Sequence, residues 1–166
     1  MTKWTTELFE EPKGTYPIER WLDDLSEQKF AAYDSAINHV LKAQGIDLLG
    51  SPWLIGISKG LYEFRIRHSA RQINSMYANA GESASADTED ILLRVFVTFY
   101  GDKIVLLLHG YDKGADVSEK RQTREIREAE RRLRAWNQQQ AVARKNSRRQ
   151  GQAAAKSATR RRCNPK

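Results

Sequence analysis

The chain has 166 residues, of which 40% are hydrophobic and 30% charged, and its formal net charge is +7. This length and balance suit one globular domain, and no apolar run reaches the eighteen or so residues of a membrane-spanning helix. A single cysteine, Cys163, excludes a disulfide framework and a cysteine-rich zinc site, and the first residues lack a secretory apolar core, so the sequence predicts a cytoplasmic protein.

The N-terminal third predicts one strand followed by helices. Residues 4–9 are rich in aromatic and β-branched side chains, which favours a strand. The apolar spacing then changes to three and four residues from Pro17 onwards, as in a helix. Ser26 is a candidate cap for a second helix, although one long helix remains an alternative, and Gly45 is the expected end.

The middle of the chain predicts a connector, a strand and an insertion. Residues 46–59 are interpreted as the connector, and residues 61–68 alternate strictly, which is typical of a strand. Tyr62, Phe64 and Ile66 fall on one side of that strand, and Glu63, Arg65 and Arg67 on the other. Residues 69–90 are mostly small and polar, so we expect a long mobile insertion with a helical turn near Ile73 to Tyr77.

Two apolar strands, residues 91–100 and 103–111, flank Gly101-Asp102 and predict a hairpin. A helix is expected from Ser118 to about residue 140. The order β-α-α-β-β-β-α predicts an α+β fold, with an antiparallel sheet, an N-terminal helical hairpin packed on it and a C-terminal helix. We therefore expect a domain over residues 1–140 and a basic, disordered tail over 141–166.

The positive charge is concentrated near the C-terminus. Residues 1–116 contain 12 Lys or Arg and 17 Asp or Glu, a net charge of −5, whereas residues 117–166 contain 16 and 4, a net charge of +12. Clustered cations favour a polyanionic partner such as nucleic acid. A tail that only solubilises the protein is an equally good interpretation.

The hairpin brings chemically useful residues together. If Gly101 and Asp102 are its only turn residues, the register places Arg94 directly opposite His109. An adjacent strand would add Glu63, Arg65 and Arg67. Arginines bind phosphate and histidine transfers protons near neutrality, so this group would suit metal-free cleavage of RNA by its own 2′-hydroxyl.

An ordinary structural interpretation stands beside that one. Glu63 would pair with an arginine across strands, and His109 would be a hydrogen-bonded histidine at a strand end. From these residues alone it is the favoured interpretation. The three histidines lack metal-ligand spacing, and there is no glycine-rich phosphate loop, so neither a metal nor a cofactor is predicted.

Three segments in order resemble the RelE/ParE toxin superfamily, especially its phage-derived, HigB-like host-inhibition branch. They are Lys59-Gly60-Leu61-Tyr62-Glu63-Phe64-Arg65, then Leu93-Arg94-Val95-Phe96, then Ile104-Val105-Leu106-Leu107-Leu108-His109-Gly110-Tyr111-Asp112-Lys113. The resemblance spans roughly residues 4–136. The chain departs from the branch at Asp112, which stands near an expected second lysine, and in the 69–90 insertion.

The resemblance implies the toxin of a type II toxin–antitoxin pair, which cleaves messenger RNA on the ribosome without a metal. Its partner would be a small helix-turn-helix antitoxin. The residues carried over as catalytic are Arg65, Arg94 and His109, and Lys113 is carried over as a phosphate contact. Lys59 and Arg67 are further candidates for RNA or phosphate binding. Two alternatives stay open: a ParE-like inhibitor of DNA gyrase, and a basic RNA-binding protein with a degenerate site.

Overall fold

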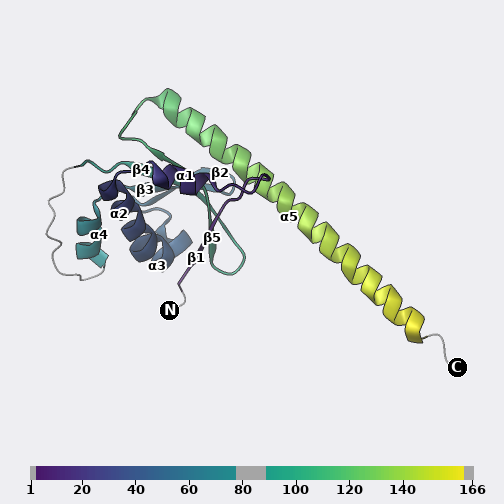
Figure 1. The fold of residues 1–166 in the computed structure, drawn as a ribbon. Coiled ribbons are helices and arrows are strands. Elements are labelled where there is room, and N and C mark those ends of the chain that lie inside the picture. Colours follow the sequence, from purple (N-terminus) through teal and green to yellow (C-terminus); the bar gives the residue numbers. More distant parts are fainter. Residues whose placement is uncertain (1–2, 78–88, 163–166) are drawn as a thin grey trace. The chain divides into compact units, whose positions relative to one another are not determined.

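The structure, a computed structural model, describes residues 3–77 and 89–162. The chain divides into two compact units between Leu133 and Arg134. The first unit is built on a five-stranded sheet of order β1-β5-β4-β3-β2 (Figure 1). Its strands are β1 (Thr5–Leu8), β2 (Leu54–Ser58), β3 (Leu61–Ile66), β4 (Leu93–Tyr100) and β5 (Ile104–Asp112). The mixed α+β class expected from the sequence is confirmed.

The helices before β2 pack on one face of the sheet, which we call the inner face. They are α1 (Pro17–Asp23), α2 (Glu27–Ala36), the π-helical turn η1 (Ile37–Leu41), α3 (Lys42–Gln44) and the 3₁₀ turn η2 (Gly45–Leu48). Ser26 breaks the helical stretch and accepts a hydrogen bond from the Lys29 backbone N–H, as a cap does. Gly45 ends it with φ of +52°, where the Trp4 ring leaves no space for a Cβ atom.

The sheet is not wholly antiparallel, which corrects the prediction. β1 pairs with β5 in parallel, with Thr5 opposite Ile104 and Leu8 opposite Leu107. The pairs β2–β3 and β4–β5 are antiparallel because a tight turn joins each of them. No such turn constrains β1, because helices and three other strands separate it in sequence from β5.

Two elements lie where the sequence predicted a connector and an insertion. β2 occupies part of the 46–59 connector, and α4 (Ala70–Tyr77) begins the 69–90 segment. Both carry core residues, since Leu54 and Ile73 are fully buried. The helical turn expected near Ile73 is thus present as α4, and the remainder of the insertion, residues 78–88, lies outside the described residues.

The β4–β5 register differs from the predicted one. Tyr100 lies opposite Ile104, so the turn holds three residues, of which Gly101 and Lys103 have φ of +54°. A shift between Phe96 and Val97 then leaves Leu108 without an opposite residue, as in a β-bulge. Together the two changes place His109 opposite Phe96 and Arg94 opposite Tyr111. The predicted Arg94–His109 pairing is therefore wrong.

The final helix α5 extends from Glu119 to Arg162. The sequence predicted a helix to about residue 140 and a disordered tail beyond it, so this prediction is wrong for the described part of the tail. Residues 141–160 lack an apolar stripe but are rich in Ala, Arg, Lys and Gln, whose helix propensity is high. Hydrophobic periodicity reports a buried face and misses a helix without one.

Candidate functional site

The candidate site lies on the outer face of the sheet, opposite the inner face. Side chains alternate along β3 and β4, so Phe64 and Val95 enter the core while Glu63, Arg65 and Arg94 lie on the outer face. Arg65 and Arg94 are directly opposite each other in the β3–β4 pair. Two adjacent guanidinium groups repel unless an anion lies between them.

That anion is Glu63, which is fully buried. Its Oε1 accepts a 2.8 Å hydrogen bond from Arg65 Nε and lies 3.5 Å from Arg94 Nε on the neighbouring strand. Arg94 is itself 2% exposed, and burial lowers the pKa of its guanidinium although the Glu63 charge opposes this effect. The arginines and their shared carboxylate thus form one buried ionic group, of which only Arg65 reaches solvent.

Tyr111 closes this group on the β5 side. Its ring stacks on Phe96 with centroids 6.0 Å apart, and the guanidinium of Arg121 of α5 lies over the ring, 5.6 Å from its centroid. Burial, followed by the Glu63 charge, raises the pKa of Tyr111 to about 12, so its hydroxyl is a neutral donor. Among the described residues, Tyr111 OH, Glu63 Oε2 and Arg94 Nε make no hydrogen bond to protein, which is unusual for buried polar atoms.

His109 lies beside this group and is held at both ring nitrogens. Nε2 bonds Glu125 of α5, and Nδ1 lies 2.6 Å from the NH1 of Arg132, which can only donate. Nδ1 must therefore be the acceptor, and Nε2 carries the proton donated to Glu125. The geometry defines a neutral histidine with one tautomer.

The electrostatics agree with this assignment. Burial, together with the Arg132 charge, lowers the pKa of His109, although the Glu125 hydrogen bond opposes the shift. Burial alone would raise the pKa of Glu125, but the bonds from His109 and Arg121 outweigh it and lower that pKa. The pair at rest is an ionised carboxylate and a neutral imidazole.

The first turns of α5, Glu119–Leu133, cover this part of the outer face. Ala129 is fully buried and Leu133 is 8% exposed, and Arg132 donates a 3.0 Å hydrogen bond to the Leu108 carbonyl, the bulge residue. Arg132 also pairs with Glu128 at 3.2 Å. In this conformation, a substrate reaches His109 only if Glu119–Leu133 leaves the outer face.

The three predicted phosphate contacts are distributed along the sheet. Arg67 is exposed just after β3, and Lys113 is half-buried just after β5, where its backbone N–H bonds the Leu92 carbonyl. Both are near Arg65 and Arg94, at the same end of the strands. Lys59 is exposed in the β2–β3 turn at the other end of β3, so the structure does not bring it to this group.

The ordinary structural interpretation of these residues is visible in the geometry: Glu63 pairs with Arg94 across strands, and His109 is fully hydrogen-bonded. Sequence reasoning missed Tyr111, Glu125 and Arg132 as members of the site. The available signal was the i, i+4, i+11 spacing of Arg121, Glu125 and Arg132, because a helical repeat of about 3.6 residues places residues at this spacing on one side of α5.

No family model, curated protein or solved structure matches the chain. Within residues 3–77 and 89–162, no helix is both long and apolar enough to cross a membrane. The same described ranges hold no cluster of three His, Cys, Asp or Glu side chains placed to bind a metal ion.

Proposed function

We propose that the chain is a cytoplasmic toxin of the RelE/ParE type, paired with a small helix-turn-helix antitoxin, and that it cleaves messenger RNA on the ribosome without a metal. The observation that carries this proposal is the Glu63–Arg94–Tyr111 group with Arg65 beside it, because three of its buried polar atoms lack a protein hydrogen bond. Buried groups of this kind cluster at functional sites.

The chemistry assigned to the group is attack of the RNA's 2′-hydroxyl on the adjacent phosphorus, with the 5′-oxygen as leaving group and a 2′,3′-cyclic phosphate as product. Arg65 and Arg94 would stabilise the charge on the phosphate oxygens. Once Glu125 and Arg132 release its nitrogens, His109 would accept the proton of the 2′-hydroxyl and return it to the leaving 5′-oxygen. Arg67 and Lys113 would hold the flanking backbone, and Lys59, at the far end of β3, would bind RNA outside the cleavage site.

The experiment is expression in a permissive bacterium, with RNA ends mapped at translated codons. Codon-phased cuts are expected from the wild type, and Arg65→Ala and His109→Gln should lose about 10²–10⁴ in cleavage rate, the usual contribution of a positioned group. Arg71→Ala, on the exposed surface of α4, is the matched control and should cut normally. An SOS-type response with intact RNA would instead indicate a gyrase inhibitor and overturn the proposal.

The antitoxin part of the proposal has its own test. The chain should co-purify from its native operon with the product of a neighbouring gene, and that partner should suppress toxicity. A partner that binds tightly without restoring growth would contradict this assignment.

A second candidate function is a non-catalytic RNA-binding protein. The engagement of both His109 nitrogens by the chain's own side chains favours it, since neither nitrogen is available for proton transfer in this conformation. The variant His109→Gln distinguishes the two candidate functions. It should abolish cleavage if the protein is a ribonuclease, and it should leave RNA binding unchanged if the protein only binds RNA.

A further inference from the structure

The second half of α5, residues 134–160, is a helix of unusual charge, which we call the basic segment. It contains seven cationic side chains and no acidic one, and Glu130 is the last acidic residue of the chain. Every residue from 141 to 160 is exposed. The seven cations are Arg134, Arg144, Lys145, Arg148, Arg149, Lys156 and Arg160.

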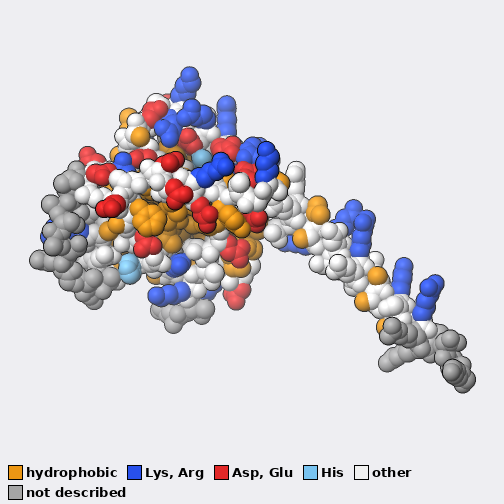
Figure 2. All heavy atoms as spheres, viewed as in Figure 1, with side chains coloured by type: hydrophobic (Ala, Val, Ile, Leu, Met, Phe, Trp, Pro, Cys, Tyr) orange, Lys and Arg blue, Asp and Glu red, His pale blue; other side chains and the backbone are white. Residues whose placement is uncertain are grey.

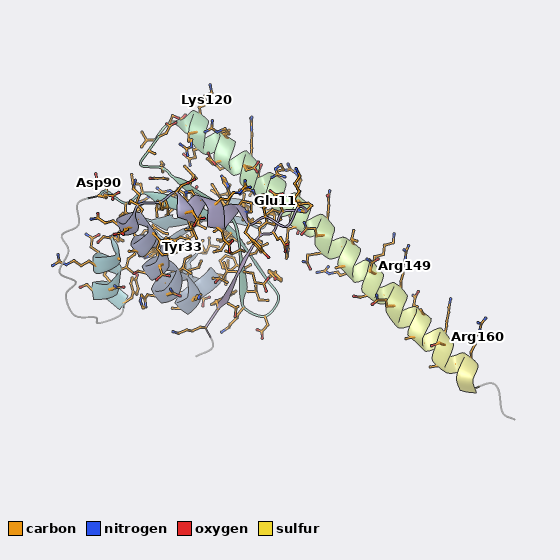
Figure 3. All side chains as sticks on the ribbon, in the orientation of Figure 1. Glu11, Tyr33, Asp90, Lys120, Arg149 and Arg160 are labelled. Carbon is orange, nitrogen blue, oxygen red and sulfur yellow. The ribbon has the colours of Figure 1, made fainter. Side chains whose placement is uncertain are left out.

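These cations share one side of the helix. With 3.6 residues per turn, all seven fall within about 160° of the circumference, and the last six span about 24 Å along the axis. Figure 2 shows the Lys and Arg side chains projecting from one side of this part of α5. In Figure 3, Arg149 and Arg160 extend to the same side although three turns separate them.

Alignment of like charges has a cost for the helix. Arg144 and Arg148 are four residues apart, as are Lys145 and Arg149, and Lys156 and Arg160. Each such pair destabilises an isolated helix by about 0.2–0.5 kcal/mol, and the segment has no carboxylate to offset the repulsion. A bound polyanion would remove this repulsion, so the alignment of the cations indicates a partner with closely spaced negative charges.

We propose that the basic segment binds the phosphate backbone of double-helical RNA. Its opposite side holds Trp136 in the first turn and then Ala, Gln, Asn, Ser and Gly. Val142 is the only large aliphatic side chain between residues 137 and 160, so there is no apolar face to enter a membrane. The same stretch has no aromatic residue on which unpaired bases would stack, which favours a duplex over a single strand. The choice of RNA over DNA rests on the proposed function.

The test uses a rearranged full-length chain with the wild-type composition. Exchanging Gln140 with Lys145, and Arg149 with Gln150, keeps the net charge but distributes the cations around the helix; the variant carries Gln140→Lys, Lys145→Gln, Arg149→Gln and Gln150→Arg. Lys145→Arg with Lys156→Arg is the matched control, because it preserves the aligned face. Circular dichroism and thermal melting check that each protein is folded.

Binding to an RNA duplex of about 20 base pairs is measured by fluorescence anisotropy at several salt concentrations, with a DNA duplex of equal length in parallel. For the wild type and the Lys→Arg control, log K should fall with log salt at a slope of about −4 to −6. The rearranged chain should bind at least tenfold more weakly, with a slope shallower by about 2.

Equal affinity of the wild-type and rearranged chains would overturn the proposal, because net charge alone would then explain binding. Equal or tighter binding to the DNA duplex would overturn RNA as the partner. If the rearranged chain fails to fold, the single exchange Arg149→Gln with Gln150→Arg, which also keeps the composition, replaces it under the same criteria.

The failure of this inference differs from that of the proposed function. Arg71→Ala, on the exposed surface of α4, should bind the duplex as tightly as the wild type. A chain that binds the duplex but does not cleave RNA would contradict the proposed function and leave this inference intact. A chain that makes codon-phased cuts but binds the duplex equally well after rearrangement would contradict this inference and leave the proposed function intact.

Discussion

The two halves of α5 have similar helix propensity and contrasting surroundings. In Glu119–Leu133, Ala129 is buried and four of the charged residues form two pairs: Arg121 with Glu125, and Arg132 with Glu128. In the basic segment, cations are aligned on one side and no carboxylate is present. Helix propensity alone would not separate the halves. Burial and charge pairing give the first half a structural role on the sheet, and leave the charges of the second half available to a polyanion.

The largest effect should come from placing a charge at equivalent alanines of the two halves. Ala129→Asp buries a carboxylate without a partner and should lower the free energy of unfolding by about 3–5 kcal/mol. Ala143→Asp, at an exposed position on the neutral side, should cost only about 0.5 kcal/mol through helix propensity. Urea denaturation measures both, and similar losses would mean that Glu119–Leu133 does not pack on the outer face.

Two neighbouring arginines of α5, Arg131 and Arg132, should contribute unequally to stability. Arg132→Ala removes the hydrogen bonds to His109 and to the Leu108 carbonyl and should cost about 2 kcal/mol. Arg131 also forms ion pairs, with Glu11 and Glu128, but its side chain is 48% exposed, so Arg131→Ala should cost less than about 1 kcal/mol. Thermal unfolding of the two variants shows which one loses more stability. A larger loss in Arg131→Ala than in Arg132→Ala would contradict the hydrogen bonds described for His109.

How much of this was predictable depends on whether a feature is local. The alternation in residues 61–68 indicated β3 and its outer-face residues, and Pro17, Ser26 and Gly45 marked helix boundaries correctly. These signals depend on steric and hydrogen-bonding preferences of single residues and their neighbours.

The features that failed depend on distant parts of the chain. The direction of β1 is decided by its pairing with β5, about a hundred residues later, and the register of His109 by a bulge at Leu108 that no local pattern marks. Glu125 was not recognised as a partner of His109 because only packing of α5 on the sheet brings the two together. Single-sequence patterns do not encode such contacts.

The smallest expected effect is a pH dependence from His109. The pKa of His109 in the folded state is lowered from 6.5, so the unfolded state binds the proton more readily. The stabilisation is therefore complete above the pKa of the unfolded state, and it is lost as the pH falls below that value. Between about pH 7.5 and pH 5.5, the free energy of unfolding should decrease more in the wild type than in His109→Gln. Denaturant curves at both pH values test this, and identical decreases would place a charged His109 in the folded state.

We propose that the outer face cleaves messenger RNA on the ribosome. The most direct measurement adds the purified chain to ribosomes programmed with a defined messenger RNA, and identifies the new RNA ends. We expect cuts within the codon being decoded that end in a 2′,3′-cyclic phosphate. These cuts should disappear with Arg65→Ala but not with Arg71→Ala. Intact RNA in the presence of excess folded protein, or equal cutting by Arg65→Ala, would contradict the proposal.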